Sequence, residues 1–337
     1  MASGPANAFC LIRSEGMGDM LLALGAAKAL KLSRNALIFI GTNRQHVSLA
    51  RACPHVDEVF TNNTEFQEII ARYPDVQVTV AQLDRASFGI ASRHQIDAYL
   101  DELGAHAPAG LKDIELRADA VATEQVAQWL RLQPAVQAGR ARVLLHASAG
   151  DPNRTWPRAH WQALASRVIK DGHQVVAISH RSTIPNRGVQ ALEVDGLLRS
   201  DDRWDAHGRL ALMRQSQLLV SPDSGPIQLA AATDIGIVGV YSVIAGSNRL
   251  PYRRGEAAWR AIAVEPACPE APCYEQLNDP KVVERYTKSK FGGRPDVPRL
   301  FAEFCLMPER YRCMTHENSV ERVYAACGKL LSAMGCV

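Results

Sequence analysis

The feature that most constrains this chain is a regular alternation of short apolar runs with amphipathic stretches at helical spacing. Short apolar runs bounded by turn residues are typical of buried strands. The repeated order of strand, helix and strand predicts an α/β fold with parallel sheets and helices on both faces. We expect strands at 9–14, 36–41, 57–61, 76–81, 142–147, 174–179, 217–221 and 236–242, and helices at 19–32, 92–103, 123–132, 157–170 and 209–215.

A break in this rhythm predicts two domains. Residues 133–140 (QPAVQAGR) contain Pro and Gly and no periodic apolar face. We therefore expect an N-terminal Rossmann-like domain at 1–138, a C-terminal Rossmann-like domain at 139–315 and a terminal helix at 316–337. Two doubly wound domains of this kind face each other across a cleft at the carboxyl ends of their strands, where such folds bind ligands.

Composition excludes several classes of protein. A net charge of +3 over 337 residues does not indicate a nucleic-acid partner. No apolar run approaches the roughly 18 residues that a membrane span needs. The first residues show no basic region followed by an apolar one, so we expect no secretory signal and a cytoplasmic protein.

The first motif, at residues 13–31, joins a strand to a helix through a turn that contains Gly16 and Gly18. Glycine in such a turn lets a ligand approach the backbone closely. Asp19 falls in the first helical turn, where it faces the expected cleft. The alternative role for Asp19 is that of a helix N-cap. The dinucleotide fingerprint G-x-G-x-x-G is not met.

The second motif, at residues 144–165, leads from a buried strand into a polar loop with Ser148 and Arg154. A guanidinium above a helix N-terminus suits an anion such as a diphosphate. A solvated surface charge is the alternative for Arg154. Trp156 and Trp161 are expected to pack in the core.

The third motif, at residues 218–233, predicts a strand, a tight polar turn and a helix. Asp223 or Ser224 can cap the helix, and Pro226 suits its first turn. The N–H groups and the macrodipole at such a helix start favour an anion.

Together, in this order, the three motifs resemble glycosyltransferase family 9, the ADP-heptose heptosyltransferases. The matching segments are Arg13, Gly18 and Asp19 before a Leu-rich helix, then HASAGDPNRTWPRAHW, then Asp223, Ser224 and Gly225 before PIQLAAA. Residues 92–104 also resemble the acceptor-domain helix of that family. The resemblance implies a GT-B fold and an inverting transfer from a nucleotide-diphosphate sugar, such as ADP-heptose, that needs no catalytic metal.

The resemblance also assigns roles to individual residues. Asp19 matches the proposed general base. The positions that match the donor-binding set are Gly18, Ser148, Arg154, Asp223, Ser224, Gly225 and Gln228. Arg154 stands where the family usually has Lys, and Gln228 where it usually has His, so the residue at position 228 cannot carry charge.

The acceptor implied by the resemblance is a hydroxyl group of the lipopolysaccharide core or a related glycan. Three alternatives remain open from the sequence. The first is a protein O-heptosyltransferase, and the second is a non-catalytic protein that binds nucleotide sugars on the same fold. The third is another GT-B enzyme such as a sugar-nucleotide epimerase, although we do not find the motifs of that enzyme.

The segment 266–313 departs from the α/β rhythm and contains Cys268, Cys273, Cys305 and Cys313. Some heptosyltransferases that modify autotransporter proteins carry a four-Cys iron site in this part of the chain, so the resemblance suggests a structural Fe or Zn ion here. Four reduced cysteines in a packed loop are the alternative. Thiolate sites of this composition suit either metal.

Between the two cysteine pairs, basic residues outnumber acidic ones over 281–299. We expect a mobile loop with solvated charge. The alternatives are a lid over the donor or a contact with an anionic glycan or lipid, which would make the protein a peripheral membrane binder.

Overall fold

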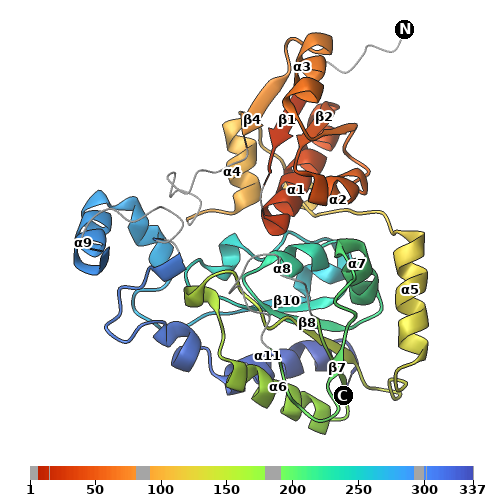
Figure 1. The fold of residues 1–337 in the computed structure, drawn as a ribbon, viewed down its shortest axis with the longest axis vertical. Helices are drawn as coiled ribbons and strands as arrows, with labels where there is room; N and C mark the ends of the chain where they lie inside the picture. Colours follow the sequence, from red (N-terminus) through yellow and green to blue (C-terminus); the bar gives the residue numbers. More distant parts are fainter. Residues whose placement is uncertain are drawn as a thin grey trace.

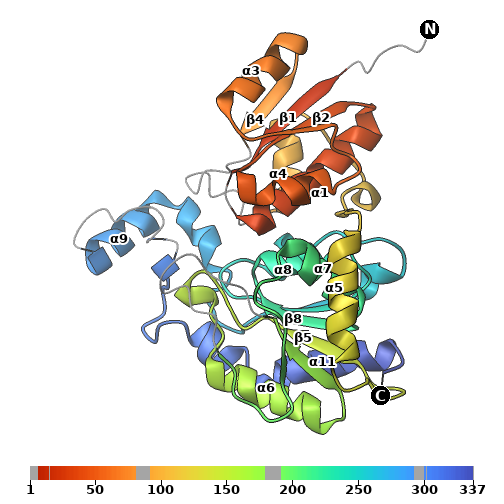
Figure 2. The ribbon, with the colours of Figure 1, turned by 45° about the vertical axis from the view of Figure 1, so that its right-hand side comes forward.

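The computed structural model describes residues 7–14, 16–80, 92–178, 191–291, 300 and 302–336. Two parallel sheets lie one above the other along the long axis of the molecule, each covered by helices (Figures 1 and 2). The described part of the chain contains no helix that is both long and apolar enough to cross a membrane.

The first sheet has the strand order β3-β2-β1-β4. Its strands are β1 (Ala8–Ile12), β2 (Leu37–Gly41), β3 (Glu58–Phe60) and β4 (Gln77–Val80). The chain moves outward from β1 to β3 and then returns to the other side of β1. The carboxyl ends of β1 and β4 therefore flank a topological switch point, where an open α/β sheet leaves a crevice.

The second sheet has the order β10-β9-β8-β5-β6-β7, which is the full Rossmann order counted from β5. Its strands are β5 (Arg142–Leu145), β6 (Gln174–Ala177), β7 (Leu198–Arg199), β8 (Leu218–Pro222), β9 (Gly236–Val240) and β10 (Ala261–Val264). All neighbouring strands are parallel. The switch point here lies between β5 and β8.

The α-helices of the first domain are α1 (Met17–Arg34), α2 (Val47–Arg51), α3 (Asn63–Arg72) and α4 (Gln95–Glu102). Those around the second sheet are α5 (Ala120–Arg131), α6 (Arg158–Lys170), α7 (Ala206–Arg214), α8 (Gly225–Ala230), α9 (Pro280–Phe291) and α11 (Val320–Ala333). The terminal helix α11, whose existence the sequence predicts, packs on α6 and on strands of the second sheet.

Helix α5 packs against α7, beside the second sheet (Figure 1). The edge-to-face pair Trp129 and Trp204, with ring centroids 5.4 Å apart, lies in this contact. The chain therefore leaves the first sheet along residues 112–119, ahead of the linker at 133–140. By its packing on α7, helix α5 belongs to the second domain. The domain division at residue 138 stays a prediction.

The two domains share one apolar cluster. Helix α1 packs along α8, and the buried side chains of both helices join a core that also contains residues beneath both sheets. The α1 helix is apolar over most of its surface, which is typical of a helix buried on several sides. The two sheets are thus fixed to each other through a helix pair rather than through the linker alone.

The predicted alternation of strands and helices is confirmed over the described residues. The short elements α2, β7 and β10, which give little periodic signal, were not predicted, and neither was the ten-residue helix α3. The prediction of a loop over 281–299 is wrong for 281–291, which lie in α9, while 292–299 lie outside the described residues. Trp156 and Trp161 are fully buried core residues, as expected.

Candidate active site

The candidate site lies where three strands end. Asp19 follows β1 in the first domain, Ser148 and Arg154 follow β5, and Asp223 follows β8. Because β5 and β8 are neighbours at the switch point of the second sheet, the two loops that follow them meet. The sequence motifs of the second domain are therefore brought together by topology alone.

Asp19 occupies the third position of α1, and the alternative in which it caps that helix is wrong. The N-cap residue is Gly16, with φ of 74°, and no side chain caps the helix start. The carboxylate instead folds back over this glycine, since a Cβ atom added to Gly16 would lie 2.7 Å from Asp19 Oδ2. Glycine at position 16 thus satisfies both the left-handed backbone and the space that the carboxylate needs.

The Asp19 carboxylate is held by two partners from its own domain. Arg13 Nη2 donates to Oδ2 at 2.5 Å, and Gln95 Nε2 lies 3.3 Å from Oδ1. The Asp19 side chain nevertheless remains 38% exposed. A carboxylate that is oriented on one side and open on the other has the geometry of a general base.

Gly18 and Gly225 bring the two domains into backbone contact beside Asp19. A Cβ atom added to Gly18 would lie 3.1 Å from the Cα atom of Gly225, and one added to Gly225 would lie 2.9 Å from Met17 Cε. Neither position has room for a side chain without local rearrangement. The starts of α1 and α8 therefore meet, which places Asp19 next to the turn of Asp223, Ser224 and Gly225.

A hydrogen-bonded relay crosses from the second domain to Asp19. Arg249 Nη1 donates to Gln95 Oε1 at 3.0 Å, and the Gln95 amide nitrogen also contacts Tyr99 Oη at 2.5 Å. Gln95 and Tyr99 are buried. Burial raises the pKa of the Tyr99 phenol, and the Asp19 charge raises it further, so Tyr99 stays neutral. The relay fixes the orientation of the Gln95 amide towards Asp19.

Further contacts on the same helix hold the domains in this arrangement. His94, the N-cap of α4, places Nε2 3.0 Å from the carbonyl oxygen of Leu250. Tyr252 Oη donates to Asp97 Oδ2 at 2.6 Å. Burial lowers the pKa of His94 to about 4, despite its contact with the Leu250 carbonyl, so this residue is neutral at physiological pH.

Arg154 ties the two loops of the second domain together. Its Nη1 donates to the Asp223 carbonyl oxygen at 2.9 Å and lies 3.7 Å from Asp223 Oδ2, while Nη2 pairs with the Asp151 carboxylate. Burial lowers the pKa of Arg154, but the charges of Asp151 and Asp223 outweigh it, and the net pKa is raised. The guanidinium is therefore a fixed cation with its charge largely compensated in this state.

Ser224 is the N-cap residue of α8, but its side chain does not cap the helix. Its hydroxyl lies 2.9 Å from Ser221 Oγ and 3.2 Å from His146 Nδ1. The expected capping by Asp223 or Ser224 is thus wrong, because the Ser224 hydroxyl belongs to a cluster with Ser221 and His146. Ser148 is buried in the loop after β5.

Gln228 lies at the interdomain contact with one polar atom unused. Its Nε2 donates to the carbonyl oxygen of Arg249 at 2.8 Å, and its Cγ would lie 3.7 Å from a Cβ atom at Gly18. Its Oε1 is buried and has no hydrogen-bond partner among the described residues. An unused carbonyl oxygen accepts a hydrogen bond from a donor such as a hydroxyl group.

The four predicted metal-ligand cysteines share one small cavity. Cys268, Cys273, Cys305 and Cys313 line a space of about 20 Å³ beside Phe304. The pKa of the Cys273 thiol is raised, first by burial and then by the charges of the other three cysteines. The pKa of Cys313 is raised to about 12 by burial and by the charges of Cys305 and Cys268. In the described residues, no group of three or more His, Cys, Asp or Glu side chains forms a metal site as it stands.

The structure adds residues that sequence reasoning did not single out. Gln95 and Tyr99 lie in the segment 92–104 that resembles the family's acceptor helix, so a signal for them existed. Asp151 and His146 lie within the second motif. Arg249 carried no signal, because it reaches Gln95 across 154 positions of the chain.

Comparisons with known proteins identify this arrangement. The model of the family described as glycosyltransferase family 9 (heptosyltransferase) matches residues 91–277, more than half of the chain. No curated protein matches the chain.

Among solved structures, similar folds include a family 9 glycosyltransferase from Veillonella parvula, with a TM-score of 0.65 at 14% identity over 97% of this chain and 98% of that one. The ADP-heptose lipopolysaccharide heptosyltransferase II of Escherichia coli gives 0.65 at 14% identity, over 97% and 99%. The iron-containing dodecameric glycosyltransferase TibC of enterotoxigenic Escherichia coli gives 0.66 at 14% identity, over 97% and 77%.

These neighbours have the GT-B fold that the two Rossmann-like sheets predict. The family match covers α4, the interdomain segment and every strand of the second sheet, and so includes Gln95, Arg249 and the turn that begins at Asp223. The chain belongs to glycosyltransferase family 9, and it is a glycosyltransferase.

Proposed function

We propose that this enzyme transfers a heptose from an ADP-heptose-like donor to an acceptor hydroxyl group with inversion at the anomeric carbon, and that Asp19 is the general base. The observation that carries the proposal is the position of the Asp19 carboxylate, which is oriented by Arg13 and Gln95 and lies beside the contact of Gly18 with Gly225. Similar structures have been solved with ADP-D-β-D-heptose, in TibC, and with ADP-2-deoxy-2-fluoro heptose, in WaaC of Escherichia coli.

In the proposed reaction, Asp19 takes the proton of the acceptor hydroxyl as its oxygen attacks the anomeric carbon. The bond from this carbon to the donor phosphate oxygen breaks, and its electron pair leaves with the diphosphate. Attack on the face opposite the leaving group inverts the configuration. Arg13 and Gln95 keep the carboxylate aimed at the acceptor, and the ordering saves entropy in the transition state.

The leaving diphosphate gains negative charge, and groups of the second domain are proposed to stabilise that charge. Arg154 supplies the cation, and the turn of Asp223, Ser224 and Gly225 supplies the start of α8, whose dipole favours an anion. Since Asp151 and Asp223 already offset the guanidinium, Arg154 also acts by shaping the turn. Ser148 lies buried in the adjacent loop and completes the proposed phosphate contacts.

Gln228 is proposed to accept a hydrogen bond from a hydroxyl group of the donor. Its Oε1 has no partner in the described structure, while its amide nitrogen is already used by Arg249. A neutral amide adds no charge to the phosphate cradle. The residue is therefore better suited to a sugar or ribose hydroxyl than to a phosphate oxygen.

The acceptor is proposed to be a hydroxyl of the lipopolysaccharide core or a related glycan, and one observation favours a protein Ser or Thr as the alternative. The four cysteines line one cavity, and TibC, a similar structure, contains iron. In number and softness these donors fit a structural Fe or Zn ion, although the side chains must move to form a ligand set. Such an ion would stiffen segment 266–313, and no reaction step requires it.

Replacing the base tests the central step. We expect Asp19→Asn to lower kcat by roughly 10²–10⁴-fold, because a positioned general base contributes about that much. Donor affinity, measured by calorimetry with ADP, is expected to stay within about twofold, a change of under 0.5 kcal/mol. Asp75→Asn, an exposed carboxylate of the same domain, is the matched control. Near-normal turnover of Asp19→Asn would exclude Asp19 as the base.

The relay is tested separately at Gln95. Gln95→Leu keeps the volume but removes both the contact with Asp19 and the acceptor for Arg249. We expect kcat to fall by about tenfold or more while the donor KM changes little, because orientation is lost and not donor contact. The exposed Gln128→Leu on α5 serves as control. An equal effect on kcat from both variants would contradict the role of the relay.

The phosphate cradle is tested at Arg154. Arg154→Ala is expected to weaken ADP binding at least about tenfold, since a charged hydrogen-bonding group and the tie between two loops are both lost. Arg158→Ala, four positions along the chain and paired with Glu193 at the surface, should bind ADP normally. Unchanged ADP affinity in Arg154→Ala would refute the assignment.

Metal analysis of the purified protein tests the cysteine cavity. We expect Fe or Zn to copurify with the chain and to be lost in Cys273→Ser, while Cys336→Ser, which lies outside the cavity, retains it. The absence of both metals, together with reaction of all eight cysteine thiols with a titrating reagent after unfolding, would show that the cluster is simply reduced.

A further inference from the structure

A second cavity lies away from the candidate active site. It encloses about 520 Å³ and is lined by residues 113–116 between the domains, by the residues before β8 and β9, by part of the segment 253–260 and by Met334. Parallel strands bind ligands at their carboxyl ends, and this cavity lies at the opposite edge, where β8 and β9 begin. None of the residues assigned to transfer lines it. Its volume is within the usual range of small-molecule sites.

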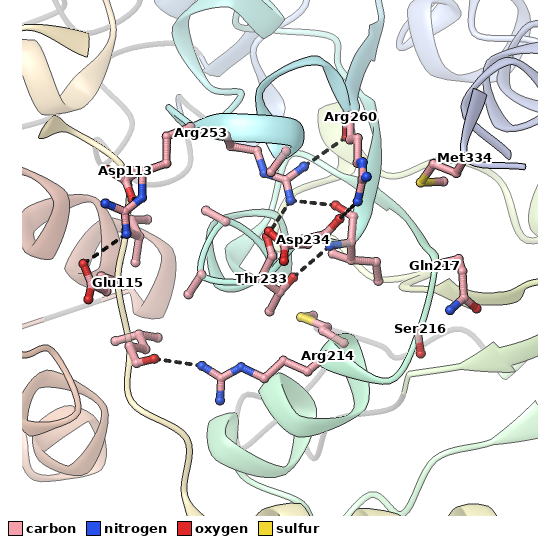
Figure 3. Close-up of a pocket in the computed structure, with 18 residues that line it drawn as sticks. Asp113, Glu115, Arg214, Ser216, Gln217, Thr233, Asp234, Arg253, Arg260 and Met334 are labelled. Carbon is pink, nitrogen blue, oxygen red and sulfur yellow. Dashed lines mark hydrogen bonds and ion pairs between the residues drawn. The ribbon is translucent and has the colours of Figure 1, made fainter. Parts of the chain in front are cut away.

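Three arginines in this cavity are held by backbone carbonyl groups. Arg214 Nη2 donates to the Leu116 oxygen at 2.8 Å, Arg253 Nη2 donates to the Thr233 and Ile235 oxygens at 2.6 and 2.7 Å, and Arg260 Nη1 lies 3.3 Å from the Asp234 oxygen. Figure 3 shows these side chains around the open space, with Arg214 below and Arg253 and Arg260 above. Carbonyl groups fix the guanidinium groups but do not neutralise them.

Within the described part of the chain, these three arginines form no ion pair with a carboxylate, whereas two of the acidic residues in the wall are already paired. Lys28 Nζ binds Asp113 and Glu115 at 2.9 Å each, and Arg254 lies 3.1 Å from Asp113 and 3.4 Å from Glu115.

The third acidic residue, Asp234, is exposed, and its charge acts on Arg253 through space. Burial nevertheless lowers the pKa of Arg253 to about 10, as expected for a cation with insufficient counter-charge. Cations therefore exceed anions around the cavity.

The remaining wall is mixed, with the polar residues Ser216, Gln217 and Thr233 beside apolar ones. Ile114, Leu116, Met213, Ile235 and Met334 face the same space as the arginines. A site that combines guanidinium donors with uncharged polar and apolar side chains suits a ligand with an anionic group on an uncharged body. The cavity is also larger than a single tetrahedral anion needs.

We propose that this cavity is a second ligand site, which binds a small organic phosphate monoester, with Arg214 and Arg260 as the phosphate contacts. Both keep N–H groups beyond those used by the carbonyl oxygens. Arg253 stays in place as a structural cation behind them. Because Arg214 also holds the Leu116 carbonyl oxygen of the interdomain segment 113–116, the bound ligand stabilises the present arrangement of the two domains.

Calorimetry with glucose 1-phosphate, and with inorganic phosphate as the simpler probe, tests the site. We expect wild type to bind the monoester more tightly than inorganic phosphate. The double variant Arg214→Gln/Arg260→Gln should weaken monoester binding at least about tenfold. Arg154→Ala in the active site and Arg167→Gln on the surface of α6 should leave it unchanged. Normal ADP binding by the double variant shows that it is folded.

Three results would overturn the proposal. They are the absence of monoester binding, equal binding by wild type and the double variant, and loss of binding in Arg154→Ala, which would place the phosphate in the active site. Inorganic phosphate binding as tightly as the monoester would likewise exclude a site built for an organic phosphate. The test requires no transferase activity, so it stands or falls separately from the proposed function.

Discussion

The backbone contact between Gly18 and Gly225 is the constraint on which the rest of the site depends. The first turn of α1 and the start of α8 approach so closely that a Cβ atom at either position would crowd the other helix. Behind this contact, the two helices bury a continuous apolar surface that spans both domains. Burial of that surface keeps the domains together, and the absence of two side chains lets the polar ends meet.

This contact explains why the polar relay has its present form. With the helix ends together, the segment 249–252 of the second domain lies against α4 of the first, and three side chains of that helix region bind it. Only one of these, Gln95, also reaches Asp19. Orientation of the carboxylate therefore depends on the relative position of the domains. The proposed base is therefore fully oriented only when the two domains are in contact.

Local pattern was sufficient for much of the fold and for the two motifs of the second domain. Strand, turn and helix follow one another at β5 and β8, and the Rossmann order then makes these loops neighbours. Local sequence pattern did not predict side-chain roles that depend on tertiary contacts. Asp19 has the residue type of an N-cap, but Gly16 takes that position with a positive φ. Arg249 lies in a short irregular segment, and its partner is known only once the domains are packed.

The departure at position 228 is easier to understand in this setting. The amide of Gln228 holds the carbonyl oxygen of Arg249, and the side chain of the same arginine holds Gln95. A protonated His at this position could supply charge to a phosphate, whereas Gln supplies a permanent neutral donor and an acceptor at the same place. Arg249 thus connects Gln228 to Gln95, which reaches Asp19, and the connection does not change with pH at position 228. In the proposed reaction, charge towards the diphosphate then comes from Arg154 and the start of α8, which are fixed by the neighbouring loops.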